Sequence, residues 1–240
     1  MSLLEEIIAS IEDDAPVSDI RICIRATAVV SKHLGLSYTF PKMHHGYTVE
    51  GQPANRRLSD MSARRLAEMS KSVDLLDAAV GLAAINSLLD ADPESLKPGN
   101  ALEVIIREGA GKNVTVVGHF PFVNRLKEQV KKLWVLELVP QEGDLPSSEA
   151  SRVIPRSDVV AITGTALINH TLEDLLDMAR DKYVVLLGPS TPASKVFFNY
   201  GVDAVCGSLV DDADAVLRGV SEGVSFRYLE GLKPFIMFKP

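Results

Sequence analysis

Short apolar runs alternate with helical patterns through the second half of the chain. The runs predict strands at residues 114–117, 133–139, 159–163, 183–187 and 204–206. Between them, apolar residues recur at helical spacing near residues 122–131, 172–180, 194–200 and 213–220. This alternation predicts right-handed crossovers and a mainly parallel, doubly wound sheet covered by helices on both faces. We expect residues 234–239 to add an edge strand.

The first half of the chain has a different pattern. Apolar residues at helical spacing predict a first helix from Leu3 to about Ile11, and alternation predicts one half-buried strand over residues 20–30. An extended segment at residues 36–40 is expected to pair with this strand as a hairpin. Two helices are then expected, one capped by Ser59 and the next capped by Ser72. Together these elements predict a small α+β domain.

Turn-forming residues separate the two halves. Asp92-Pro93 and Pro98-Gly99 fall within ten residues of one another, and Asn100 is placed to cap the helix that follows. The sequence therefore predicts an α+β domain at residues 1–98 and an α/β domain at residues 99–240.

Composition narrows the class of protein. A formal net charge of −7 argues against a nucleic-acid surface. The two cysteines, Cys23 and Cys206, are far apart and indicate reduced thiols in a cytoplasmic protein. No apolar run approaches the roughly 20 residues of a membrane span, so no membrane partner is expected. A homodimer is a reasonable expectation for a protein of this size and class.

Small and polar residues follow the predicted parallel strands. Because the carboxyl ends of parallel strands lie at one edge of the sheet, these residues are expected to line a ligand site there. Glycine lets backbone amides approach a ligand closely, and hydroxyl groups offer donors and acceptors without bulk. The candidates are Gly118, His119 and Phe120 after the first strand, Glu137 and then Asp144 after the second, Thr163, Gly164, Thr165 and Asn169 after the third, and Gly188, Pro189, Ser190 and Thr191 after the fourth.

His119 is the candidate for chemistry. Imidazole has an ordinary pKa of about 6.5, which suits proton transfer, and a turn at the mouth of a pocket would expose it. The alternative is a histidine that is hydrogen-bonded to the backbone and holds the turn. Asn169, Ser190 and Thr191 have a similar alternative, since each could cap the helix that follows it. The buried amide of Asn86 needs a partner, which is either backbone or a ligand.

Three familiar kinds of site do not match the sequence well. A dinucleotide fold needs glycines spaced G-x-G-x-x-G, and here only Gly118 is present, although Glu137 is placed like the acid that binds ribose. The sequence does not exclude a nucleoside-like ligand such as S-adenosylmethionine. His44 and His45 invite a metal site, but no cysteine or acidic residue follows at metal-ligand spacing, so no metal ligand is assigned. Motifs of serine hydrolases, P-loop proteins and zinc proteases are missing.

Several short motifs, taken in order, resemble a known family. They are Gly46-Tyr47, the helical residues 81–86, and the strand-end residues 118–121, 163–169 and 188–192. Their order and spacing resemble the putative heavy-metal chelation family of prokaryotic proteins over nearly the whole chain. This resemblance implies an enolase N-terminal-like domain followed by a Rossmann-like domain with partial similarity to methyltransferases.

The resemblance also implies a ligand, but no established reaction. It suggests a pocket between the domains, to which Tyr47 and Asn86 would contribute, for a pterin-, flavin- or siderophore-like molecule. Any metal would then arrive within an organic chelate, and no cofactor is identified. Three functions stay open: an enzyme of condensation, hydrolysis or group transfer that uses His119, a non-catalytic binding protein for a metal chelate or its precursor, and an S-adenosylmethionine-dependent methyltransferase.

Overall fold

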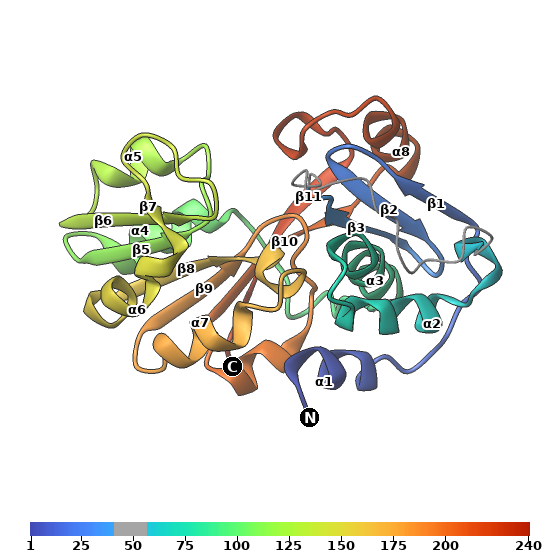
Figure 1. Cartoon of the computed structure of the whole chain (residues 1–240), viewed down its shortest axis with the longest axis horizontal. Helices are drawn as coiled ribbons and strands as arrows, with labels where there is room; N and C mark the ends of the chain where they lie inside the picture. The colour runs from blue at the N-terminus through green and yellow to red at the C-terminus, as the bar shows by residue number, and fades with distance from the viewer. Residues whose placement is uncertain (41–56) are drawn as a thin grey trace. The chain divides into compact units, whose positions relative to one another are not determined.

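The computed structural model describes residues 1–40 and 57–240, and its contacts divide the chain into two compact units (Figure 1). The large unit comprises residues 1–6, 90–209 and 233–240, and the small unit comprises residues 7–89 and 210–232. Both units are therefore discontinuous in sequence, whereas the sequence analysis expects a single boundary at residue 98.

An eight-stranded, mainly parallel sheet forms the centre of the large unit, as predicted. Its strands are β4 (Lys97–Pro98), β5 (Asn113–Val117), β6 (Lys132–Glu137), β7 (Leu145–Pro146), β8 (Val159–Thr163), β9 (Tyr183–Leu187), β10 (Ala204–Val210) and β11 (Leu232–Phe238). Their order is β4-β11-β10-β9-β8-β5-β6-β7, and the pairs from β10 to β7 are parallel. The predicted edge position of the last strand is wrong, because the two-residue β4 pairs antiparallel with β11 on its outer side.

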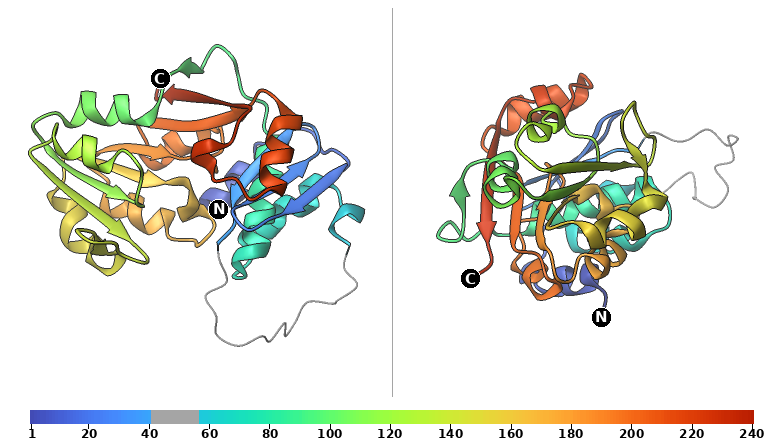
Figure 2. Two further views of the ribbon diagram at one scale, coloured as in Figure 1. Left: turned by 90° about the horizontal axis from the view of Figure 1, so that it is seen from above. Right: turned by 90° about the vertical axis from the view of Figure 1, so that its left-hand side faces the viewer.

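Helices cover both faces of this sheet. They are α4 (Ala101–Gly109), η3 (Ser147–Glu149), η4 (Ile154–Arg156), η5 (Gly164–Leu167) and η6 (Lys195–Tyr200), with α5 (Val123–Lys127), α6 (Ala150–Val153) and α7 (Leu172–Met178). Val104 and Ile105 of α4 pack on one face against residues of β5, β8, β9, β10 and β11. Figure 2 shows α4 beside β11. The alternate strand residues, such as Ile162 and Leu186, are also buried, so both faces are covered.

The small unit contains a separate antiparallel sheet. Its strands are β1 (Asp19–Ile22), β2 (Ala26–Val30) and β3 (Leu34–Tyr38), in that order, and its helical segments are η1 (Leu58–Asp60), α2 (Ala63–Ala67), η2 (Glu68–Lys71), α3 (Leu75–Leu88), α8 (Ala213–Ser221) and η7 (Phe226–Tyr228). Helix α1 (Leu3–Ala9) crosses the division between residues 6 and 7. The predicted hairpin is confirmed by the pairing of β2 with β3.

Local details of the small unit differ from the prediction. The single strand expected over residues 20–30 is two strands, because the chain turns after Cys23 and its amide donates to Ala26 O. The expected caps at Ser59 and Ser72 are also wrong. Ser62 caps α2 by accepting from the Arg65 amide, and Asp74 caps α3. In both cases a better placed oxygen a few residues further on satisfies the first-turn amides.

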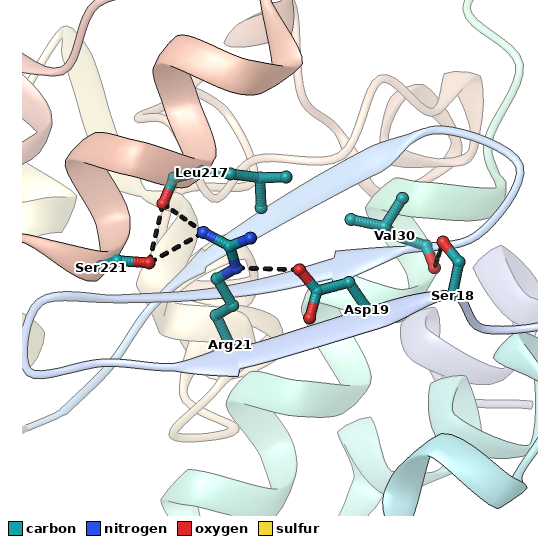
Figure 3. Close-up of polar contacts among 6 residues, drawn as sticks. All are labelled: Ser18, Asp19, Arg21, Val30, Leu217 and Ser221. Atoms are coloured by element: carbon teal, nitrogen blue, oxygen red, sulfur yellow. Dashed lines mark hydrogen bonds and ion pairs between the residues drawn. The ribbon is translucent and has the colours of Figure 1, made fainter.

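Helix α8 completes the core of the small unit, although it lies more than 120 residues beyond α3 in the chain. Val216 and Val220 of α8 pack with Ala26 and Ala28 of β2. Arg21 of β1 donates from Nη1 to the Leu217 carbonyl at 2.8 Å and to Ser221 Oγ at 2.9 Å, and from Nε to Asp19 at 2.8 Å (Figure 3). One guanidinium thus ties the carboxyl half of α8 to the sheet.

Across residues 1–40 and 57–240, no helix combines the length and the hydropathy that a bilayer span requires.

Candidate functional site

Three loops of the large unit meet at the carboxyl edge of the sheet. A methyl group added at Gly118, after β5, would lie 3.2 Å from Thr163 Cβ at the end of β8. One added at Gly188, after β9, would lie 4.0 Å from Thr163 Oγ1 and from the Gly164 amide nitrogen. Gly118 and Gly188 have φ of +101° and +120°, which side chains rarely adopt. The backbone of Gly118 and Gly188 therefore lies close to Thr163 and Gly164, which brings the three loops together.

The contact lies where the direction of chain winding reverses. Strand β5 comes first among the parallel strands and is flanked by β6 on one side and β8 on the other. In open α/β sheets, ligands bind outside the carboxyl ends of the strands at such a reversal. Gly118 follows β5 and Thr163 ends β8, so this edge of the sheet is the candidate site.

Some polar groups predicted to bind a ligand bond to one another. Thr163 Oγ1 accepts from the Thr165 amide at 3.3 Å and lies 3.0 Å from Thr165 Oγ1. Asn169 Oδ1 accepts from the hydroxyl of Thr171 at 2.7 Å and from its amide at 3.3 Å. These contacts hold the loop after β8.

Thr191 is different. Its residue is 3% exposed, and its Oγ1 has no hydrogen-bond partner among the described residues. The hydroxyl faces Gly164, where an added methyl group would lie 2.3 Å from it. The neighbouring Ser190 is 2% exposed. Ser194, and neither of these two, accepts from the Val196 amide to cap η6. Among the described residues, no hydrogen bond therefore accounts for the burial of the Thr191 hydroxyl.

His119 bonds to a carboxylate that the sequence analysis does not assign to it. Its Nδ1 lies 2.9 Å from Oδ2 and 3.0 Å from Oδ1 of Asp144, whose side chain is only 3% exposed. The Gln141 amide also donates to Asp144, at 3.1 Å. An ionised carboxylate only accepts, so Nδ1 carries the hydrogen in this bond. In neutral His119 the Nε2 atom then keeps its lone pair, and it bonds to no described residue.

Glu137 has a supporting contact in the same place. Its Oε2 accepts from the His119 amide at 2.8 Å. The two carboxylates therefore bind different parts of His119. Glu137 accepts from its backbone amide, and Asp144 binds its ring. One oxygen of Glu137 is already used by this bond, whereas the methyltransferase hypothesis assigns Glu137 to a ribose.

A cavity of about 170 Å³ opens beside these loops, entirely within the large unit. It is lined mainly by apolar atoms, from Gly99, Asn100, Ala101, Phe120, Phe122, Leu187, Gly188, Pro189, Cys206, Gly207, Ser208, Pro234 and Phe235. Phe120, Gly188 and Pro189 are thus the predicted residues that reach it. Asn100, the predicted cap of α4, accepts from the Glu103 amide and places the start of that helix at the cavity.

Cys206 lines the cavity as a buried thiol. It is 4% exposed, and burial raises the pKa of its thiol to about 12. The thiol is therefore protonated at neutral pH and behaves as a small apolar group rather than as a nucleophile.

The remaining predicted residues lie elsewhere. Asn86 belongs to α3 of the small unit, and its Nδ2 donates to the Leu36 carbonyl of β3 at 2.7 Å, so backbone supplies the expected partner. Tyr47, His44 and His45 lie outside the described residues.

Sequence reasoning placed Asp144 among the residues after the second strand but did not pair it with His119, and it did not identify Cys206 as a site residue. The turn at Gly143, with φ of +91°, brings Asp144 back to a histidine 25 residues earlier, and only its place after the second strand hinted at this. Residues 1–40 and 57–240 bring together no three histidine, cysteine or acidic side chains suited to a metal ion.

Two family models match the chain. Both carry the description "putative heavy-metal chelation", one over residues 4–89 and the other over residues 100–236. An uncharacterized protein of Methanocaldococcus jannaschii is 28% identical over 223 residues, which cover 86% of this chain and 83% of the relative.

Two crystal structures have the same fold. A protein of unknown function of the DUF364 family from Desulfitobacterium hafniense superposes with a TM-score of 0.84 at 25% identity, covering 99% of this chain and 98% of the other. A second, from Pyrococcus horikoshii, gives 0.82 at 20% identity, with coverage of 99% and 98%. The family model that matches residues 100–236 covers more than half of this chain, so the chain belongs to the putative heavy-metal chelation family.

Proposed function

We propose that this protein is an enzyme that acts on a small organic molecule at the carboxyl edge of the large sheet, with His119 as general acid or base. The proposed substrate is a chelator or chelator precursor of the pterin, flavin or siderophore kind, and the reaction is a condensation, hydrolysis or group transfer. The family description supports the connection with chelation. Any metal would enter as part of the organic chelate.

The pair of His119 with Asp144 is the observation that carries this proposal. The buried carboxylate fixes the ring and its tautomer, so that Nε2 is the atom left to take or give a proton. It also stabilises the imidazolium that forms when Nε2 takes a proton. A histidine that only held the turn would not need this carboxylate, because Glu137 already binds the backbone amide of His119.

The test starts from ligand screening. S-adenosylmethionine, a pterin, riboflavin and an iron(III) catecholate are added separately, and the melting temperature shows which of them binds the native state. The compound that gives the largest shift is then incubated with the protein, alone and with water or a second nucleophile as co-substrate, and products are followed by mass spectrometry.

His119→Gln and Asp144→Asn are the informative variants. We expect both to lower turnover by about 10²–10⁴-fold, the range of general acid–base catalysis, with a small change in ligand affinity. His33→Gln, in the small unit, is the matched control and should keep the full rate. Full turnover by His119→Gln would contradict the proposal. A ligand that binds tightly with no turnover in the wild type would favour the non-catalytic binding protein instead.

A further inference from the structure

The cavity beside Gly188 has the size of one ring. An engineered protein cavity of about 150 Å³ binds benzene, whereas drug-sized ligands occupy about 300–1,000 Å³. The volume here is about 170 Å³. It admits a six-membered ring with a short substituent, but it cannot enclose the three fused rings of a flavin.

The walls of the cavity favour an aromatic ring. Phe120 and Phe122 stack with their planes 10° apart and their centroids 5.2 Å apart, and both line the cavity. Phe235 and the thiol of Cys206 line it as well. Aromatic rings add attraction to one another beyond the area they bury, and sulfur packs favourably on ring edges. A saturated ring of the same size would gain only the burial.

Backbone contacts fix the floor of the cavity. The Gly188 amide donates to the Cys206 carbonyl at 3.0 Å, which joins the carboxyl ends of β9 and β10. A methyl group added at Gly207 would lie 2.6 Å from a ring atom of Phe235 and 2.9 Å from the Thr191 carbonyl oxygen. Residues 188 and 207 cannot move far without breaking these close contacts, so the cavity is preformed.

From size, walls and floor together, we infer that this cavity binds one aromatic ring of the ligand. Phe120 directly follows His119, so the ring pocket and the catalytic histidine share one loop. The inference rests on the proposed function in that both concern one ligand, and it specifies the substrate class: a molecule that carries a monocyclic aromatic group. The ring is the part that is held, and the reacting group extends from it toward the edge of the sheet.

Phenol is the probe, and cyclohexanol is the size-matched probe without an aromatic ring. We expect phenol to bind about three- to tenfold more tightly in a ligand-observed NMR titration, as aromatic pairing predicts. Amide shifts should map the bound phenol to residues 187–189 and 206–208. Equal affinity of the two probes, or shifts confined to other residues, would overturn the inference.

Ala101→Phe fills the cavity from the start of α4. Leu138→Phe is the matched control, because it adds a ring at a side chain that is 53% exposed. Ala101→Phe should weaken phenol binding at least about tenfold while Leu138→Phe leaves it unchanged. If Ala101→Phe does not fold, judged by its melting curve, Ser208→Leu fills the same space from β10 and should have the same effect. Wild-type affinity for phenol in a folded filling variant would sink the inference.

His119→Gln separates this inference from the proposed function. It should bind phenol within about twofold of the wild type, since the ring pocket does not use the imidazole. If His119→Gln keeps both its turnover and its phenol binding, the catalytic role of His119 is wrong and the ring pocket is supported. If His119→Gln loses turnover and neither it nor the wild type prefers phenol over cyclohexanol, the ring pocket is wrong and the catalytic role is supported.

Discussion

Both units pair buried hydroxyls, and each leaves one without a partner among the described residues, Ser70 in the small unit and Thr191 in the large unit. In the small unit, Thr27 and Thr39 join their hydroxyls at 2.8 Å, and Ser37 donates to the Ala79 carbonyl at 2.6 Å. In the large unit, Thr191 keeps a buried hydroxyl without a partner among the described residues, and His119 turns its Nε2 away from the carboxylate that holds it. The small unit uses its polar groups to bind its own elements together.

The two units differ in what lies near these groups. An unpaired buried hydroxyl costs about 1–3 kcal/mol, so a purely structural edge would be expected to pair it or to replace it. Ser70 is the exception in the small unit, since its buried Oγ also has no partner among the described residues. A glycine packs closely on each of these residues: Gly81 of α3 packs on the Ser70 backbone, and Gly164 packs on Thr191. What sets the large unit apart is the pair of His119 with Asp144, together with a cavity lined by Gly188 and Pro189 on the loop that leads to Thr191.

The largest expected effect tests the packing of the small unit. Gly81→Ala puts a methyl group 1.9 Å from the Ser70 amide nitrogen, which is backbone and cannot move aside easily. Alanine would gain about 1 kcal/mol in helix propensity, but we expect the clash to dominate and the free energy of unfolding to fall by about 3 kcal/mol or more. Urea denaturation followed by far-UV circular dichroism measures the change.

Gly111→Ala is the control for glycine replacement in general. Gly111 has φ of +70° and open space around it, so only backbone strain of about 1 kcal/mol is expected. If the two variants lose the same stability, contact with Ser70 is not what Gly81 provides.

The next prediction compares the two units through one isosteric change. Thr27→Val leaves the buried Thr39 hydroxyl without its partner and should cost about 2 kcal/mol. Thr191→Val removes a hydroxyl that has no partner, so it should be neutral or should stabilise the free protein by up to about 1 kcal/mol. Thermal melts of the two variants measure both changes. A loss of about 2 kcal/mol in Thr191→Val would show that this hydroxyl is paired after all.

The smallest effect concerns the thiol in the wall of the cavity. Burial raises the pKa of Cys206 from 9.0 to about 12, so the stability it contributes is fully present below pH 9 and is lost as the pH rises through 12. At pH 10 the thiol of Cys206 is mostly ionised in the unfolded protein and protonated in the folded protein. This difference lowers the free energy of unfolding by about 1 kcal/mol. Cys206→Ala should therefore lose less stability than the wild type between pH 8 and about pH 10.

Burial also raises the pKa of Tyr200 to about 12, with a further contribution from its hydrogen bond to Glu6, so both proteins lose stability from this group in the same range. Only the difference between the wild type and Cys206→Ala reports the thiol. A thiol reagent at pH 8 should modify the half-buried Cys23 before Cys206. Faster modification of Cys206 would contradict its burial.

The parallel sheet and its loops could be predicted because their signals are local. Apolar runs flanked by glycine and hydroxyl residues mark each strand and turn, and the mainly parallel sheet is confirmed. The break between β1 and β2 gave no such signal, since Ile22, Cys23 and Ile24 continue the alternation of a strand without a glycine or proline. The packing of α8 on β2 and the bond of Asp144 to His119 join distant residues, and a periodic pattern does not show which distant partner a side chain meets.

The discontinuity of the small unit has a consequence for synthesis on the ribosome. Its first three strands are made early, but α8, which covers Ala26 and Ala28, begins only at residue 213. At about 5–20 residues per second, that apolar face stays uncovered for roughly ten seconds or longer while the large unit is translated. During this interval the nascent chain offers a surface to chaperones, and a stop codon before α8 would leave the amino-terminal sheet without its cover.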